Sequence, residues 1–328
     1  MSRIAPRLRR RLSVPLAATA AAILALVPQT ATAYPNPGHV TGDIAVHDPT
    51  MIRDAAGRYL LASTGQGLQL RTSVDRIAFA RAGDAFAVKP AWWSGYSSVP
   101  EAWAPDLTYR DGRYVMYYSV SSFGSQNSAI GLATSTTGQP GTWTDRGIVL
   151  SSGSGDDYNA IDPNLFVDDD GSWWLSFGSW WSGIKLVRLD PATGRRHASD
   201  TAVRALAARP DRQGIEAPSL VKRNGVYFLF ASYDRCCAGT SSTYKIKVGR
   251  ATRITGPYLD RAGVPMTDGG GTLVLESHGR VVGPGGQSVL KDSDGHLLVY
   301  HYYDGQDAGR AKLGVNLLGW SGGWPSAY

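Results

Sequence analysis

The sequence predicts an all-β protein folded as a five-bladed β-propeller. Three observations carry this prediction. One unit occurs five times: a short apolar run, opened in most copies by an acidic residue beside a proline, is followed by an Asx–Gly turn and an aromatic-rich run. The copies start near residues 48, 106, 162, 216 and 286, and this spacing suits four short strands per blade. The chain also has 39 glycines, 10 tryptophans and 16 tyrosines, a composition that favours β structure.

Each copy pairs two apolar runs across a turn that is a strong hairpin signal. Since one hairpin is unstable alone, we expect the five to stack around an axis. The inner hairpins are expected over residues 48–62, 105–118, 162–177, 216–231 and 285–300. Outer strands are expected at 68–71, 79–81, 129–135, 184–189 and 244–250. Residues 202–208 are the one short helix candidate.

Residues 1–33 have the pattern of a secretory signal peptide. Five arginines precede an apolar run of 12 residues at 16–27, which is too short to span a bilayer. Ala31-Thr32-Ala33 fits the small-residue rule for cleavage. We therefore expect a secreted, extracellular protein whose mature chain is one propeller domain, residues 34–328. The alternative is an ordered N-terminal helix.

Charge and hydropathy limit the partners of the mature chain. The segment 1–33 carries five Arg and no Lys, Asp or Glu, so its removal lowers the formal charge from +6 to 6 − 5 = +1. No basic stripe remains, so we expect no nucleic-acid partner. No other apolar stretch is long enough for a membrane helix, so we expect no membrane partner. We also expect a monomer.

The only cysteines are the neighbours Cys236 and Cys237. In an exported protein they could form a disulfide between adjacent residues, and the alternative is a pair of free thiols. Two adjacent cysteines without clustered histidines make a poor zinc site, so this pair predicts no metal centre.

Three acidic residues occupy the start of the inner hairpin in different copies: Asp48, Asp162 and Glu216. In a propeller they would converge at one mouth of the central channel. Asp106 follows Pro105, out of register, and we interpret it as structural. Carboxylates held close together have pKa values that spread apart, as acid/base cleavage of a glycosidic bond requires. The alternative is that these residues merely begin strands.

At these residues the sequence resembles the arabinanases of glycoside hydrolase family 43. The resemblance runs through the mature chain. It includes the motifs His47-Asp48-Pro49, Trp103-Ala104-Pro105-Asp106, Ser121-Ser122-Phe123-Gly124, Asn159-Ala160-Ile161-Asp162-Pro163-Asn164, Phe177-Gly178-Ser179-Trp180-Trp181-Ser182-Gly183-Ile184, Ile215-Glu216-Ala217-Pro218 and Gly323-Trp324-Pro325, together with the stretch from Cys236-Cys237 to Ile246.

The resemblance implies a five-bladed propeller and an inverting mechanism. It implies Asp48 as general base, Glu216 as general acid and Asp162 as the residue that orients the acid and tunes its pKa. Substrate contacts are expected at Trp103, Phe123, Asn159, Ser179 and His301, although His301 could equally be a packed channel residue. Inversion predicts that base and acid lie about 6.5–9.5 Å apart, leaving room for a water.

This sequence departs from the family pattern at one position where the family is expected to bind a cation. Many arabinanases have Gly-Pro-Gly-His where this chain has Gly283-Pro284-Gly285-Gly286, and that histidine binds a cation, Ca²⁺ or Na⁺, in the channel. Either the cation is absent here, or waters and another group such as His301 hold it. We assign no metal and expect the chemistry to need none.

The resemblance therefore predicts a secreted inverting hydrolase of α-1,5-linked arabinan or arabino-oligosaccharides, endo-acting rather than exo-acting. A β-xylosidase-like specificity is disfavoured, because the matched loops are those of arabinanases. The alternative from another class is a sugar-binding propeller without catalysis. Loop shape at the channel mouth decides between endo and exo action, and the sequence does not give it.

Overall fold

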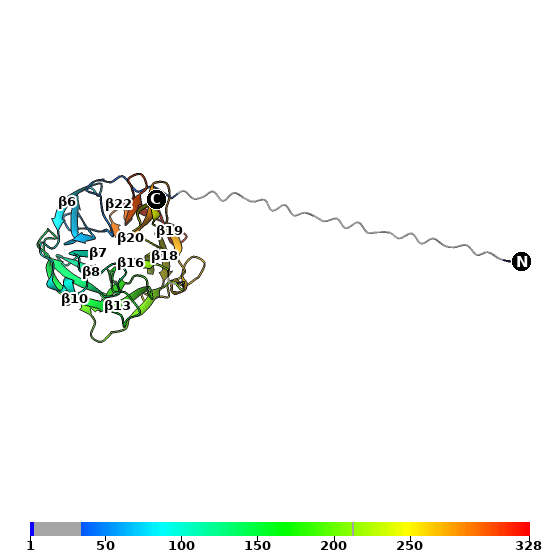
Figure 1. Cartoon of the computed structure of the whole chain (residues 1–328), viewed down its shortest axis with the longest axis horizontal. Coiled ribbons are helices and arrows are strands. Elements are labelled where there is room, and N and C mark those ends of the chain that lie inside the picture. Colours follow the sequence, from blue (N-terminus) through cyan, green and yellow to red (C-terminus); the bar gives the residue numbers. More distant parts are fainter. Residues whose placement is uncertain (3–33, 212) are drawn as a thin grey trace. The chain divides into compact units, whose positions relative to one another are not determined.

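The computed structural model describes residues 1–2, 34–211 and 213–328, so the expected secretory signal lies, apart from its first two residues, outside the described residues. Residues 34–328 form one compact unit. They fold into five sheets around a common axis, antiparallel except that β1 pairs parallel with β6, with the inner strands near the centre and outer strands such as β6 and β10 toward the rim (Figure 1). The predicted five-bladed propeller is confirmed.

The blades follow one another along the chain. Blade 1 contains β1 (Thr41–Gly42), β2 (Thr50–Arg53), β3 (Tyr59–Ser63), β5 (Gln69–Ser73) and β6 (Ala78–Asp84). Blade 2 contains β4 (Gly65–Gln66), β7 (Glu101–Arg110), β8 (Arg113–Val120), β9 (Ser128–Ser135) and β10 (Thr144–Ser152). Blade 3 contains β11 (Asn164–Val167), β12 (Trp173–Phe177), β13 (Ile184–Asp190), β14 (Arg195–Arg196) and β15 (Arg204–Ala207).

Blades 4 and 5 each have four strands. Blade 4 contains β16 (Ile215–Arg223), β17 (Val226–Tyr233), β18 (Lys245–Ala251) and β19 (Thr272–Leu275). Blade 5 contains β20 (Val281–Asp292), β21 (Gly295–Asp304), β22 (Arg310–Ser321) and β23 (Trp324–Ala327). Three short 3₁₀ helices lie between strands: η1 (Ala91–Gly95), η2 (Gly239–Ser241) and η3 (Met266–Asp268).

The helix candidate at 202–208 is wrong. The stretch forms β15, which pairs antiparallel with β13, Ala207 lying opposite Ile184. Leu206 and Ala207 are buried in the apolar cluster between blades 3 and 4. Burial against a neighbouring strand has outweighed the weak helical preference of an alanine-rich segment, because intrinsic propensities amount to less than about 1 kcal/mol per residue.

Five apolar clusters hold the blades together, one at each interface between neighbouring blades. The cluster between blades 5 and 1 joins Val46 and Leu61 to Val299 and Leu313. The segment before β2 reinforces this closing interface, because Gly38 N–H donates to the carbonyl of Val315 and Leu313 N–H donates to that of Ile44. The two ends of the domain are therefore bonded to each other.

A ring of hydrogen bonds runs around the channel where the inner strands begin. At this point each blade has one residue in the left-handed region of backbone space, with φ between 41° and 57°, and its N–H donates to a side chain of the preceding blade. The pairs are Asp48 to His301, Ala104 to Thr64, Asp162 to Ser119, Ala217 to Asp162 and Gly286 to Ser232, at 2.9–3.1 Å.

A second ring lies two residues further along the inner strands. The side chains of Thr50, Asp106 and Asn164 each accept the backbone N–H of a leucine in the next blade. Asp106 is thus a structural acceptor, buried between blades 2 and 3, and it also accepts from the Asn164 amide at 2.9 Å. The second ring agrees with the interpretation of Asp106 as structural.

The rings also correct the register inferred from sequence. Asp48 and Asp162 occupy equivalent positions, but Ala217 fills that position in blade 4, and Glu216 lies one residue earlier. The pairing of β16 with β17 is irregular between Glu216 and Ser219, as it is at the same place in blades 2 and 5, so Glu216 occupies the position that Trp103 and Gly285 occupy in those blades. The acid of blade 4 therefore leaves its strand in a different direction from the other two.

Burial in the second ring raises the pKa of Asp106 to about 7, against the opposing effect of the Leu165 and Asn164 donors. The folded protein then binds a proton between about pH 4 and 7 that the unfolded chain releases, so this residue's contribution to stability falls as pH rises through that window. We expect the melting temperature of the wild type to fall from pH 5 to pH 7.5 more steeply than that of Asp106→Asn, measured by circular dichroism. Parallel pH dependences would contradict this assignment.

Candidate active site

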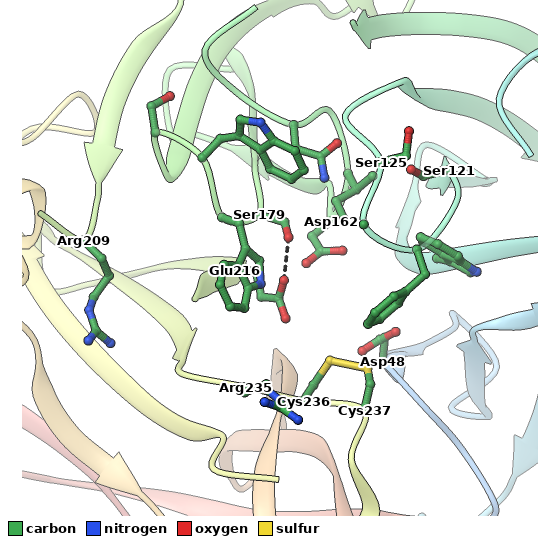
Figure 2. A pocket seen from close by; sticks show the side chains of 18 of the residues that line it. Asp48, Ser121, Ser125, Asp162, Ser179, Arg209, Glu216, Arg235, Cys236 and Cys237 are labelled. Carbon is green, nitrogen blue, oxygen red and sulfur yellow. Dashed lines mark hydrogen bonds between the residues drawn. A yellow bond between two sulfur atoms is a disulfide. The ribbon is translucent and has the colours of Figure 1, made fainter. Parts of the chain in front are cut away.

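A groove of about 1210 Å³ crosses the face of the propeller at which the first hydrogen-bond ring lies. Blades 1 to 4 supply its walls, and among the described residues blade 5 supplies none. Asp48, Asp162 and Glu216 all line it and turn their carboxyl groups toward the same space (Figure 2). The convergence expected from the repeat is therefore present, in spite of the shifted register of Glu216.

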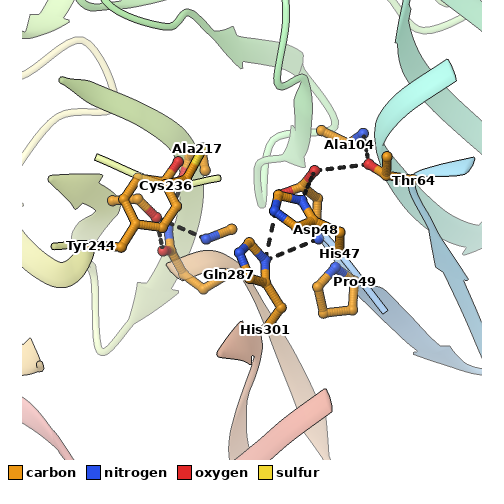
Figure 3. Close-up of polar contacts among 12 residues, drawn as sticks. His47, Asp48, Pro49, Thr64, Ala104, Ala217, Cys236, Tyr244, Gln287 and His301 are labelled. Atoms are coloured by element: carbon orange, nitrogen blue, oxygen red, sulfur yellow. Dashed lines mark hydrogen bonds and ion pairs between the residues drawn. The ribbon is translucent and has the colours of Figure 1, made fainter. Parts of the chain in front are cut away.

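Asp48 is held by residues of blades 1 and 5. Its Oδ2 accepts hydrogen bonds from the His47 ring and the Thr64 hydroxyl, both at 2.8 Å, and its N–H donates to His301 (Figure 3). The backbone of Asp48 is left-handed, with φ at 47°. Aspartate tolerates this conformation better than most residues, and such strained positions cluster at functional sites.

Glu216 is buried and both of its carboxylate oxygens accept hydrogen bonds. Ser179 Oγ donates to Oε2 at 2.5 Å, and the Tyr244 hydroxyl donates to Oε1. Asp162 lies beside Glu216 in the groove and accepts the backbone N–H of Ala217 at 3.0 Å. Because Ala217 follows Glu216 directly, this contact fixes the strand that carries the glutamate relative to Asp162.

The surroundings separate the pKa values of the three acids. Burial opposes ionisation of Asp48, but the His47 ring, His301 and the Thr64 hydroxyl outweigh it and lower the pKa of Asp48 to about 2. Burial, followed by the charges of Glu216 and Asp48, raises the pKa of Asp162 well above its ordinary range. Burial also raises the pKa of Glu216, against the two hydroxyl donors. One acid is thus kept ionised while its two neighbours favour the protonated form.

The other predicted site residues divide into two groups. Trp103, Phe123, Asn159 and Ser179 line the groove. The ring of Phe123 is 85% exposed, whereas Asn159 is buried and accepts from Ser128 at 2.6 Å. His301 does not line the groove and is fully buried beneath it. Its ring stacks on His47 at 3.7 Å between centroids, so we correct its expected role from sugar contact to packed support.

Several groove residues were missed at the sequence level. His47, Thr64 and Tyr244 contact the acids directly. His47 and Tyr244 lie inside the motifs of the family resemblance, but their hydrogen-bond partners depend on contacts between segments far apart in the sequence. Trp180 and Trp181 line the groove with φ at 54° and 38°, a conformation that is rare for bulky side chains. Nothing in the sequence signals that strain.

Cys236 and Cys237 form a disulfide, which decides between the two alternatives left open by the sequence. Both residues line the groove, on the side of Asp48 (Figure 2). The bridge closes only a local ring, so its effect on the fold is confined to this loop and to the groove wall that the loop forms.

His47, Asp48 and His301 each offer a ligand atom within 4.8 Å of the others, so we tested them as a cation site. They do not fit one. Both ring nitrogens of His47 are hydrogen-bonded, and Nδ1 of His301 accepts from the backbone of Asp48. Nε2 of His301, which is buried without a hydrogen-bond partner among the described residues, is the one histidine nitrogen of the set left for a ligand. A Cβ at residue 286 would lie 2.4 Å from Asp48 Oδ1, so no side chain there fits beside them. That the chemistry needs no metal stays a prediction.

Comparison with known proteins matches this arrangement to one family. The sequence profile of glycosyl hydrolases family 43 matches residues 39–325. The chain belongs to glycosyl hydrolase family 43. The extracellular endo-α-(1→5)-L-arabinanase 1 of Bacillus subtilis is 48% identical over 290 residues, which cover 86% of this chain and 87% of that protein.

Two further relatives extend the comparison. The solved structure of an endo-arabinanase from Bacillus licheniformis superposes with a TM-score of 0.82 and 45% identity, covering 88% of this chain and 99% of that one. The extracellular exo-α-(1→5)-L-arabinofuranosidase ArbA of Cellvibrio japonicus is 38% identical over 86% of both chains. The relatives of this chain thus include proteins named as endo-acting and as exo-acting.

Replacing Ser179 by alanine tests the electrostatics of Glu216. The Ser179 hydroxyl favours the ionised carboxylate, so its loss should raise the pKa of Glu216 further. The chain has only three glutamates, so ¹³C-glutamate labelling and an NMR titration can resolve each carboxyl. Glu101 and Glu276 lie outside this contact and serve as internal references. An unchanged or lowered Glu216 midpoint would contradict the assignment.

Proposed function

We propose that this protein is a secreted, inverting hydrolase that cuts α-1,5-linked arabinan internally. The single observation that supports this most strongly is the convergence of three carboxylates with separated pKa values in one groove of a family 43 propeller. The extracellular names of two relatives support secretion. In the described part of the chain, no helix combines the length and apolar character needed to cross a membrane.

Asp48 acts as the general base in this proposal. Its low pKa keeps it ionised over the whole working range, so it can take a proton from water as that water attacks the anomeric carbon. His47 and Thr64 both donate to Oδ2, which leaves Oδ1 as the oxygen with free capacity. In a single inverting step the water oxygen bonds to the sugar from the face opposite the leaving group.

Glu216 acts as the general acid. Burial and the nearby negative charge of Asp48 favour its protonated form, and the proton passes to the glycosidic oxygen as the C–O bond breaks. Asp162 lies beside Glu216 and, with its own pKa raised, itself favours the protonated form; it also holds the Ala217 backbone, which fixes the acid in place. We expect the acid and base carboxyls to lie about 6.5–9.5 Å apart, with the water between sugar and Asp48.

The aromatic and small polar side chains of the groove walls bind the sugar. Trp103 and the exposed Phe123 offer flat faces to the C–H surfaces of arabinose rings. Substrates are arabinan and its oligosaccharides. We favour endo action because the curated endo-acting relative is 48% identical and the exo-acting one 38% identical. The second candidate mode, release of arabinose or short oligomers from chain ends, uses the same three acids.

Product analysis on linear and branched arabinan tests the proposed activity. We expect a ladder of oligosaccharides early in the reaction, followed by chromatography over time, because internal cuts produce intermediate lengths first. Arabinose alone from the start would replace the endo mode with the exo mode. Retained binding without any cleavage would overturn the enzyme assignment and favour a sugar-binding propeller.

Glu216→Gln tests the acid. Glutamine keeps the size of the side chain but cannot donate a proton to the leaving oxygen, so kcat should fall by about 10²- to 10⁴-fold, the usual contribution of general acid catalysis. The melting temperature and binding of arabino-oligosaccharides should change little. Asp106→Asn, a neutralised carboxylate outside the groove, is the matched control and should keep its activity. A Glu216→Gln enzyme with near-normal turnover would remove the acid assignment.

A further inference from the structure

A chain of hydrogen bonds leads from the disulfide loop to Asp48. The backbone N–H of Cys237 donates to the hydroxyl of Tyr303 at 2.7 Å. That hydroxyl lies 2.8 Å from Nε2 of His47, and Nδ1 of His47 lies 2.8 Å from Oδ2 of Asp48. Tyr303 is buried on β21, in blade 5, and does not line the groove. It therefore reaches Asp48 only through His47.

Burial lowers the pKa of His47, but the charge of Asp48, its hydrogen bond and the charge of Glu216 outweigh burial and raise that pKa. In the protonated ring both nitrogens donate, Nδ1–H to Asp48. For the neutral ring, the donors and acceptors around His47 admit one consistent assignment. A phenol has one proton to donate, and the Tyr303 oxygen already accepts from Cys237. Because the ionised carboxylate of Asp48 only accepts hydrogen bonds, the imidazole proton lies on Nδ1, facing Asp48; Nε2 is then an acceptor and takes the proton of the Tyr303 hydroxyl. Burial raises the pKa of Tyr303, so the phenol keeps the proton that this assignment requires.

We propose that Tyr303, held by the Cys237 backbone, is a positioning residue that fixes the ring of His47 so that Nδ1–H donates to the general base Asp48. The inference rests on the proposed role of Asp48 as base. His301 stacks on a face of the His47 ring, so it restricts the tilt of that ring. Tyr303 and His301 together then hold the His47 ring in the orientation in which Nδ1–H faces Asp48.

The charged and titratable groups around this chain are few. Asp48 and Glu216 face His47. The groups that face Asp48 are His47, His301, Asp162, Glu216 and Tyr244. Asp48 and Glu216 also face Tyr303. All the carboxylates in this set are negative when ionised, so the Nδ1–H donation is a specific stabilisation of the Asp48 charge against repulsive neighbours. Losing it should make Asp48 easier to protonate.

Tyr303→Phe removes the hydroxyl and leaves His47 Nε2 without its partner. We expect kcat to fall by about tenfold and the acidic limb of the kcat/KM profile to move up by about 0.5–1 pH unit, with KM changed less than about threefold. The limb moves up because a base with a raised pKa is lost to protonation at higher pH. The measurement is a full pH–rate profile on linear arabino-oligosaccharides.

The matched control is Tyr302→Phe. Tyr302 is the neighbour of Tyr303 on β21 and is also buried, but its side chain projects to the opposite face of the blade, away from His47. Its pH profile should match that of the wild type. A Tyr303→Phe profile with unshifted limbs would overturn the proposal, even if the overall rate falls, because a purely structural role lowers the rate without moving a titration.

A double-mutant cycle with His47 tests the route of the effect. If Tyr303 acts through His47, adding Tyr303→Phe to His47→Ala should change neither kcat nor the acidic limb further, whereas independent effects would add. Additivity would contradict the proposal. Failure of the proposed function would look different, because the wild type would then not cleave arabinan, or Asp48→Asn would remain active.

Discussion

The propeller depends on hydrogen bonds that each blade makes to the one before it. At the start of every inner strand a left-handed residue turns its N–H out of its own sheet, and a side chain of the preceding blade accepts it. In blade 3 the residue that follows β12 is Gly178, which has no side chain to offer, and Asp162 accepts from Ala217 in its place. A catalytic candidate thus carries part of the ring that organises the fold.

This sharing of roles explains why the acids sit where the sheets are most constrained. Asp48 and Asp162 are themselves left-handed residues of the ring, so their side chains leave the backbone in a fixed direction toward the channel mouth. Groups with such fixed positions need little reorganisation when charge develops in a reaction, which is the main source of electrostatic catalysis. The cost is backbone strain at both residues, which the surrounding hydrogen bonds and apolar interfaces between blades offset.

Much of the fold could be predicted because its signals are local. Each turn glycine and each pair of apolar runs can be recognised within about fifteen residues, and the five copies of this hairpin unit predict five blades. The three acids were found for the same reason. What could not be predicted depends on packing between blades: the offset of Glu216 from the left-handed position, the burial of His301, the donors Ser179 and Tyr244 on Glu216, and the strand at 204–207. These features join residues that are far apart in the chain.

The bond between the two ends of the domain has a consequence for how activity arises during folding. Gly38 and Val315 are separated by 315 − 38 = 277 positions, so their contact is among the most distant that the chain forms. Asp48 likewise needs His301 beneath it. A nascent chain that has completed four blades already contains all three acids, yet the first of them still lacks its partner. Catalytic activity should therefore appear only when the last blade docks, and it should not increase stepwise as each blade forms.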